Sequence, residues 1–102
     1  MTANPLRGEA VLVVAGAQRL LRPTFTALVA AEEELGPLFA LVERAGAGQL
    51  RLAEIAALFW HCLADREGLS RETVGQAVAE IGLVEAAKPL RALLAQILQG
   101  SG

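Results

Sequence analysis

His61 and Cys62 are neighbouring residues whose side chains could serve as a base and a nucleophile. Adjacent positions on a helix point about 100° apart, so these two side chains would not face each other. The sequence holds no second histidine, and Asp65, four residues after His61, is placed to pair with it. We therefore expect a structural His61–Asp65 pair, a buried Cys62 that behaves as a small hydrophobic residue, and no catalytic activity.

The acidic run Glu32–Glu34 is a second candidate for chemistry, as a set of metal ligands. Three consecutive carboxylates spread around a helix and do not converge on one cation, so we expect no metal site. We interpret the run as a solvated helix end, with an electrostatic docking patch as the alternative. The glycines of residues 46–48 lack the Gly-Lys-Ser/Thr sequence of a phosphate-binding loop, so we predict a flexible turn and no cofactor.

The composition favours a folded, helical protein with apolar surface to spare. Hydrophobic residues make up 54% of the chain and charged residues 20%, and the formal net charge is −2. Few polar residues remain to cover the surface, so we expect some apolar surface to contact a partner. The nine basic residues are scattered, which argues against a nucleic-acid partner.

Targeting signals are weak in this sequence. The apolar run Ala10–Val14 is too short for a signal peptide, and Glu9 interrupts its start. No stretch is long enough and free enough of charge to cross a membrane, so we expect no membrane partner. With Cys62 as its one cysteine, the chain cannot form an intramolecular disulfide, and we expect a reducing compartment.

The N-terminal region predicts a β-hairpin over residues 7–23. Residues 9–14 favour a strand, residues 15–18 a short connection, and residues 19–22 an antiparallel return. Val11 and Val13 point to one face, and Leu12 and Val14 to the other, so both faces are apolar. Because an isolated hairpin is only marginally stable, at least one face must pack on helices. The second face is either covered by another helix or left for a neighbouring molecule.

Pro23 ends the second strand of the hairpin, because it has no N–H to donate to a strand ladder. The rest of the chain is predicted to be helical. Thr24 fits a helix N-cap, and Gly36 fits the residue just past the helix end. The residues expected on one apolar face of this helix are Phe25, Leu28, Val29 and Leu35. A short second helix follows over residues 38–45, with Leu38, Leu41, Val42 and Ala45 on one face.

The third predicted helix, Ala53–Ala64, is expected to lie at the centre of the fold. Its polar positions, Glu54 and His61, fall on one narrow stripe, and nearly all others are apolar. A helix that is apolar nearly all round belongs inside a bundle.

Two further helices are predicted in the C-terminal third. Ser70 fits the N-cap of the fourth helix, and Gly82 fits its end. The fifth helix spans about residues 84–98. Pro89 either kinks this helix or marks a late start. Residues 70–83 could also form the second helix of a helix-turn-helix, a DNA-binding alternative. Its exposed face would be partly acidic and poorly suited to reading DNA, with Arg71, Glu72, Gln76 and Glu80.

We therefore predict an α+β fold, an N-terminal antiparallel β-hairpin packed on a bundle of about five α-helices. One domain covers residues 1–102, with a flexible N-terminus over 1–6, the hairpin over 7–23, helices over 24–99 and a frayed end over 100–102. The leucine-rich face of the last helix is either core or interface. The residues predicted to bind a partner are Val11, Val13, Leu90, Leu94 and Leu98.

The order of segments resembles the small tail assembly chaperones of gene transfer agents and related siphophage-like prophages. The resemblance covers nearly the whole chain, and its most specific part is the strand–Arg-Pro-Thr-Phe–helix passage. The matching residues include Arg7-Gly8-Glu9, Leu21-Arg22-Pro23-Thr24-Phe25, Ala27-Leu28, Glu32-Glu33, Gly36, Leu52, Ile55-Ala56, Leu58-Phe59-Trp60, Leu63, Leu69-Ser70, Val74-Gly75, Gly82-Leu83, Pro89-Leu90 and Leu93-Leu94.

This resemblance implies a non-enzymatic role in tail morphogenesis, in the cytoplasm of a bacterial host and transiently with assembling tails. Such proteins are thought to form oligomers with their own copies, to bind the largely helical tape measure protein, and to hand it to tail-tube subunits. Similar proteins are also described as tail tube components, so a permanent structural role in the tail is the alternative within the same class.

Overall fold

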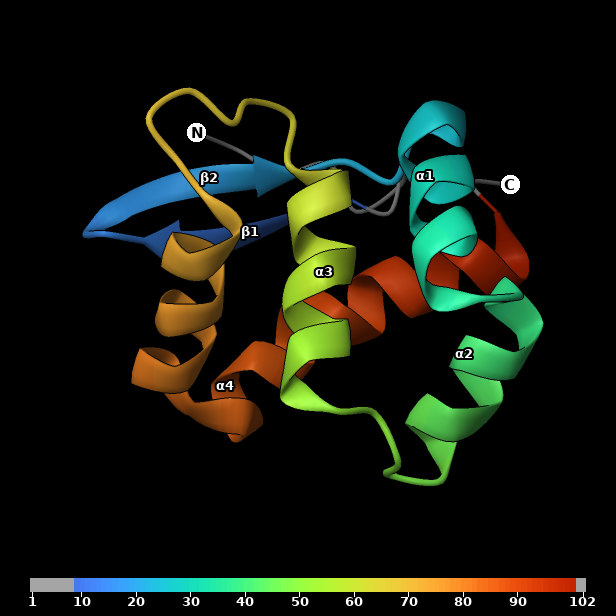
Figure 1. Cartoon of the computed structure of the whole chain (residues 1–102). Coiled ribbons are helices and arrows are strands. Elements are labelled where there is room, and N and C mark those ends of the chain that lie inside the picture. Colours follow the sequence, from blue (N-terminus) through green and yellow to red (C-terminus); the bar gives the residue numbers. More distant parts are fainter. Residues whose placement is uncertain (1–8, 101–102) are drawn as a thin grey trace.

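The computed structural model describes residues 9–100. The predicted flexible residues 1–6 and the last two residues of the predicted frayed end lie outside this range. The elements, in chain order (Figure 1), are β1 (Ala10–Val14), β2 (Ala17–Leu21), α1 (Phe25–Leu35), α2 (Leu38–Gly46), α3 (Leu52–Cys62) and α4 (Arg71–Gln99).

β1 and β2 form the predicted antiparallel hairpin, with Val14 paired with Ala17 next to the turn. The connection is only the two residues Ala15 and Gly16, both with positive φ, as the common two-residue hairpin turn requires. On β1, Leu12 and Val14 are buried, whereas Val11 is half-buried and Val13 is 44% exposed. The hairpin therefore packs one apolar face on the protein and leaves Val13 open on the other.

The outer edge of β2 is paired with the chain that leaves α3. The Arg22 N–H donates to the Cys62 carbonyl at 2.6 Å, and the Ala64 N–H donates to the Leu20 carbonyl at 3.0 Å. These bonds supply partners for strand groups that would otherwise point away from the hairpin. They also fix the end of α3 beside the sheet.

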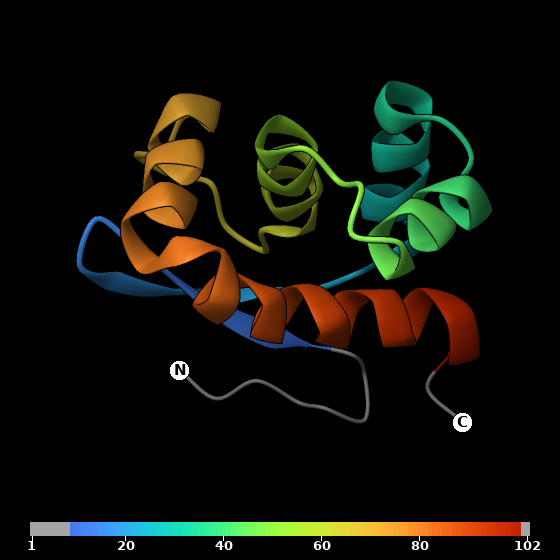
Figure 2. The same cartoon turned by 90° about the horizontal axis from the view of Figure 1, so that it is seen from below.

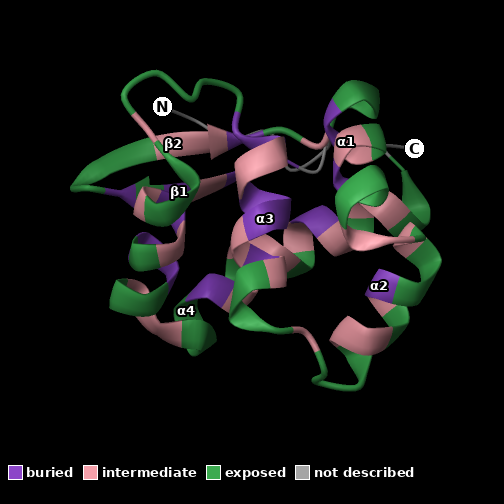
Figure 3. Cartoon of the chain, viewed as in Figure 1, coloured by how far each residue is buried: buried purple, intermediate pink, exposed green. Residues whose placement is uncertain are grey.

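α3 is the central helix, as its narrow polar stripe predicts. Phe59, Leu58 and Cys62 are almost completely buried, and Trp60 is partly buried against the same core. Figure 3 shows the buried positions gathered on α3 and on the element faces that surround it. α3 packs against α1 on one side and α4 on the other.

The ends of α1 agree with the sequence signals, but its buried face does not. The Thr24 side chain accepts a bond from the Ala27 N–H, and Gly36 ends the helix. The predicted apolar face is wrong in part, because Phe25 is 83% exposed and Val29 is also exposed. Alanines face the core instead, Ala27 and Ala31. Their small side chains allow close packing of α1 on α3, and this packing selects the buried face.

The prediction of about five helices is wrong for residues 9–100, where the structure has four. The two segments expected on either side of Gly82 are joined in α4 without an intervening loop. Gly82 itself has φ 84° and ψ 157°, so the helix changes direction there rather than at Pro89, which keeps helical dihedral angles. Gly82 thus interrupts the helix at the predicted position, but the chain resumes the helix immediately.

Figure 2 shows that the elements form two layers. The first half of α4, α3 and α1 stand side by side in one layer, and the hairpin and the second half of α4 lie in the other. α4 reaches both layers because of its change of direction at Gly82. Its contacts with α3 and with β1 are among the most extensive in the fold.

We predict that Gly82→Ala lowers the free energy of unfolding by about 1–3 kcal/mol, because this combination of φ and ψ is nearly restricted to glycine. Gly75→Ala is the matched control within the same helix. An added methyl at Gly75 would meet the Ala56 Cβ at an ordinary 3.9 Å, so this change should be neutral or stabilise by up to about 1 kcal/mol. Urea denaturation measures both changes. A neutral or stabilising Gly82→Ala would contradict the prediction.

Candidate partner-binding surface

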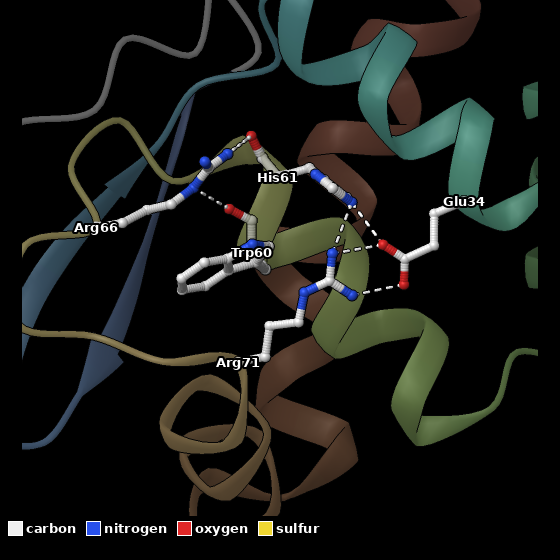
Figure 4. A network of polar contacts seen from close by, with 5 residues as sticks. All are labelled: Glu34, Trp60, His61, Arg66 and Arg71. Carbon is white, nitrogen blue, oxygen red and sulfur yellow. Dashed lines mark hydrogen bonds and ion pairs between the residues drawn. The ribbon is translucent and has the colours of Figure 1, made fainter.

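A polar cluster connects three helices across the front of the molecule (Figure 4). Glu34 of α1 accepts two bonds from the Arg71 guanidinium of α4, both at 2.6 Å. The Glu34 carboxylate also lies 2.8 Å from the His61 Nε2 atom of α3, which lies 3.3 Å from Arg71. One carboxylate therefore bridges residues that are 27 and 37 positions away in the sequence.

The predicted His61–Asp65 pair is wrong. α3 ends at Cys62, so Asp65 no longer follows the helical spacing that would bring it to His61, and its carboxylate accepts the Glu67 N–H instead. The interpretation of residues 32–34 as a simple solvated helix end is also incomplete. Besides Glu34 in the cluster, Glu32 accepts the Leu38 N–H at 3.0 Å, which satisfies an unpaired donor at the start of α2.

Arg66 closes the C-terminal end of α3. Its guanidinium donates to the carbonyls of Trp60 and His61, at 2.9 and 3.1 Å, and lies 5.0 Å from the centroid of the Trp60 ring. These carbonyls belong to the last turn of α3, where the donors four residues further along the helix run out. The Trp60 carbonyl also accepts the Leu63 N–H, at 3.4 Å. A cation at a helix C-terminus also interacts favourably with the helix dipole.

The electrostatics of these groups indicate structural roles. Hydrogen bonds from Arg71 and then from His61 lower the pKa of Glu34 from its ordinary 4.5 to about 2. Burial raises the pKa of the Cys62 thiol to about 12, so it stays protonated and is a poor nucleophile. Cys62 is thus the buried hydrophobic residue that the sequence predicts. Within residues 9–100, no group of three or more His, Cys, Asp or Glu side chains is placed to hold a metal ion.

No helix in the described part of the chain has the length and apolar character needed to span a lipid bilayer.

The structure argues against the helix-turn-helix alternative, because the basic residue Arg71 is not free to contact DNA. α4 starts at Arg71 with Ser70 as its N-cap, as the sequence predicts. Both terminal nitrogens of Arg71 are bound to Glu34, however, so its charge is paired within the fold. This geometry disfavours α4 as a helix that reads DNA.

The five residues predicted to bind a partner fall on two separate surfaces. Val11 and Val13 lie on the hairpin. Leu90, Leu94 and Leu98 lie on the second half of α4, at spacings of four residues that place them on one helix face. Leu98 is 54% exposed, whereas Leu90 and Leu94 are partly buried against the core.

Two apolar hollows lie where the second half of α4 runs beside α2. The first, which we call the Phe39 hollow, has a volume of about 260 Å³. It is lined by Glu32, Pro37, Leu38, Phe39, Val42, Ile97 and Leu98. Phe39, next to the N-terminus of α2, is 78% exposed although it is aromatic. The hollow therefore presents an open apolar surface at the C-terminal end of α4.

The second, which we call the Leu83 hollow, has a volume of about 160 Å³. It is lined by Ala45, Gly48, Leu50, Ile55, Leu83, Ala86, Ala87 and Leu90. The end of α2 faces the first turns after Gly82 here, whereas the start of α2 faces the last turn of α4 at the Phe39 hollow. α2 and the second half of α4 are therefore antiparallel, with one apolar hollow near each end.

Two exposed residues that line these hollows, Phe39 and Leu83, are not among the residues predicted to bind a partner. Phe39 lies one position after Leu38, about 100° from the apolar face of its short helix. A large aromatic residue outside the apolar face of its helix was the sequence signal that could have indicated an exposed contact residue. Leu83 and Val84, at 60% and 82% exposure, directly follow the glycine that turns the helix.

These features define a small α+β protein with a buried apolar central helix, a structural polar cluster and exposed apolar hollows. Residues 7–100 match the family described as "Phage tail tube protein, GTA-gp10". The chain therefore belongs to this family, and it is a tail protein of the phage and gene-transfer-agent type. No curated protein and no solved structure matches it.

We predict that Glu34→Gln removes a pH-dependent contribution to stability. Because the pKa of Glu34 is lowered on folding, the unfolded chain binds more protons between pH 2 and pH 4.5. The contribution is therefore present above about pH 4.5 and is lost as the pH falls to about 2. We expect a loss of about 0.5–1 kcal/mol near neutral pH, since the pair is partly exposed.

Denaturation curves across this pH range measure the effect, with Glu33→Gln as the matched control on the same helix. Glu33 is exposed and lies outside the polar cluster, so its variant should follow the wild-type pH dependence more closely. Equal pH profiles for wild type and Glu34→Gln would contradict the role assigned to the cluster.

Proposed function

We propose that this tail protein is a non-enzymatic assembly chaperone that binds an amphipathic helix of the tape measure protein. The observation that carries the proposal is the pair of apolar hollows between α2 and α4, with Phe39, Leu83 and Leu98 exposed beside them. Large exposed apolar patches on a small protein mark contact surfaces. We name the tape measure protein as the partner because the order of segments in this chain resembles that of tail assembly chaperones.

The dimensions of this surface suit a helix. From Leu83 to Leu98 the helical rise is about 22 Å, which is about four turns of a partner helix. The leucines at 90, 94 and 98 recur at the spacing with which one helix packs against another, and the two hollows offer room for partner side chains. Burial of apolar area would supply about 25 cal/mol per Å² before the costs of association, so the complex should resist high salt.

Handover to tail-tube subunits would follow from this binding mode. A bound apolar helix is kept from aggregating, and a polymerising tube that covers the same helix can displace the chaperone. We place this activity in the cytoplasm of the bacterial host, where tails assemble.

A permanent structural role in the tail is the second candidate function. The description of the family as a tail tube protein favours it. In that case the same apolar hollows would be covered by a neighbouring tail subunit in the finished particle, rather than by a helix that is later released.

The two candidates predict different contents of finished particles. A permanent component should be present in purified tails at a fixed ratio to the tube subunit, whereas a chaperone should be abundant in the producing cell and depleted from tails. Quantitative mass spectrometry of both fractions measures this ratio. A fixed stoichiometric ratio in the tail fraction would overturn the chaperone proposal.

We predict that Phe39→Asp weakens binding of the tape measure helix by about 10- to 100-fold, because the variant removes one large apolar side chain from the contact. Phe25→Asp is the matched control, since Phe25 is an equally exposed phenylalanine in the first turn of α1 and lies outside both hollows. An aspartate in a first helical turn is favourable for the helix dipole, so both variants should fold.

Co-purification with the tape measure product and titration with its helical segments test this prediction. Circular dichroism confirms that both variants keep their helices. Equal binding by Phe39→Asp and wild type would exclude the Phe39 hollow as the contact surface.

A further inference from the structure

Glu43 lies on the α2 side of the surface that runs from the Phe39 hollow to the Leu83 hollow, which we call the α2–α4 surface. It follows Val42, which lines the first hollow, and precedes Ala45, which lines the second. It is also four residues after Phe39, so these two side chains share one face of the helix. Glu43 is exposed and forms no ion pair within residues 9–100.

Arg91 lies on the α4 side of the same surface. It is four residues after Ala87 of the Leu83 hollow and seven residues before Leu98 of the Phe39 hollow. These spacings place the three side chains on one face of the helix. Arg91 is exposed, and it too has no ion pair in the described part of the chain.

The α2–α4 surface therefore carries one charge of each sign between its two hollows, on opposite sides. α2 lies beside the second half of α4 (Figure 2), and the two are antiparallel with a hollow near each end, so residues between the hollows lie at about the same level. Arg44 is the remaining charged residue in this interval, and it is paired with Glu54 at 2.7 Å. The α2 side is thus acidic and the α4 side basic.

We propose that Glu43 and Arg91 fix the direction in which an amphipathic helix lies on the α2–α4 surface. A helix with its apolar side in the two hollows turns one flank toward α2 and the other toward α4. Charge complementarity favours basic residues on the first flank and acidic residues on the second. The preferred occupant is therefore a helix with basic residues along one side of its apolar stripe and acidic residues along the other.

Such a helix has one favourable direction. Turning it end for end, with its apolar side still in the hollows, exchanges its flanks and brings like charges together at both positions. The hollows alone do not distinguish the two directions by charge, since both accept apolar side chains. The hollows thus supply affinity, and the two charges supply direction. This inference rests on the proposed function, to which it adds the charge pattern and the direction of the bound helix.

A pair of matched peptides tests the direction. Both keep the apolar face of the tape measure segment that the wild-type protein binds most tightly. The first carries Glu along one side of that face and Lys along the other, and the second has all of these Glu and Lys residues exchanged. A nitroxide at the peptide N-terminus broadens the amide NMR signals nearest to it. We expect one peptide to broaden signals around Leu83 and the other to broaden signals around Leu98.

Exchange of the charges on the protein should reverse these results. The double variant Glu43→Lys with Arg91→Glu should turn both peptides end for end. The double variant Glu80→Lys with Lys88→Glu is the matched control, because it makes the same sign changes at exposed residues that line neither hollow. It should leave both directions as in wild type. Circular dichroism checks that both double variants keep their helices.

A single reversal gives a second readout, in affinity. Arg91→Glu makes both sides of the α2–α4 surface acidic. A third peptide, with Lys on both flanks, should bind this variant about three- to tenfold more tightly than wild type at low salt, since two exposed charge contacts are each worth little. The difference should shrink at high salt, where exposed charges are screened.

The inference is overturned if the first two peptides share one direction on wild type, if each lies in both directions equally, or if neither binds. It is also overturned if Glu43→Lys with Arg91→Glu leaves the directions unchanged. The proposed function fails by a different result, namely equal binding of the tape measure segment by Phe39→Asp and wild type. Loss of the peptides in Phe39→Asp, with directions that ignore the charge exchange, would overturn this inference alone.

Discussion

The apolar surface of α3 is the constraint on which the rest of the structure depends. Leu58, Phe59 and Cys62 are almost fully excluded from solvent, and Ala57 is buried as well. Burial of such side chains contributes about 1.5–3 kcal/mol each for the larger ones, so the surrounding elements must cover α3 on several sides. α1 and α4 do so with small or branched residues, and the exit of α3 is hydrogen-bonded to β2. The polar cluster then holds α1, α3 and α4 together at their exposed edge.

Coverage of α3 also explains the shape of α4. Its first half packs Val74, Ala77 and Val78 into the core, and its second half contributes Ala86 and Leu93. A straight helix could not follow α3 and also run beneath the hairpin, so the change of direction at Gly82 is needed for both tasks. The consequence is exposure of Leu83 and Val84 directly after the turn. The apolar surface near the Leu83 hollow is therefore a product of the same constraint that builds the core.

Local signals predicted much of this fold. Thr24, Ser70 and Gly36 act at helix ends through hydrogen bonds or dihedral angles within a few residues, and such effects are readable from the sequence. The central position of α3 follows from its own composition. The polar cluster was not predictable, since Glu34 reaches its partners only after three helices have packed. The exposure of Phe25 could not be predicted from periodicity either. The packing of α1 on α3 buries the face of α1 that carries its alanines.

The candidate surface was predicted in part, and α4 shows why. Its leucine-rich face was expected to be either core or interface, and in the structure it is divided between the two. Leu93 is fully buried, Leu90 and Leu94 are half-buried, and Leu98 is more than half exposed. The second half of α4 faces the core, α2 and the hairpin at once, so residues a few positions apart serve different neighbours. Sequence periodicity identifies such a helix as apolar, but only the packing of α2 and β1 decides which of its residues remain open to a partner.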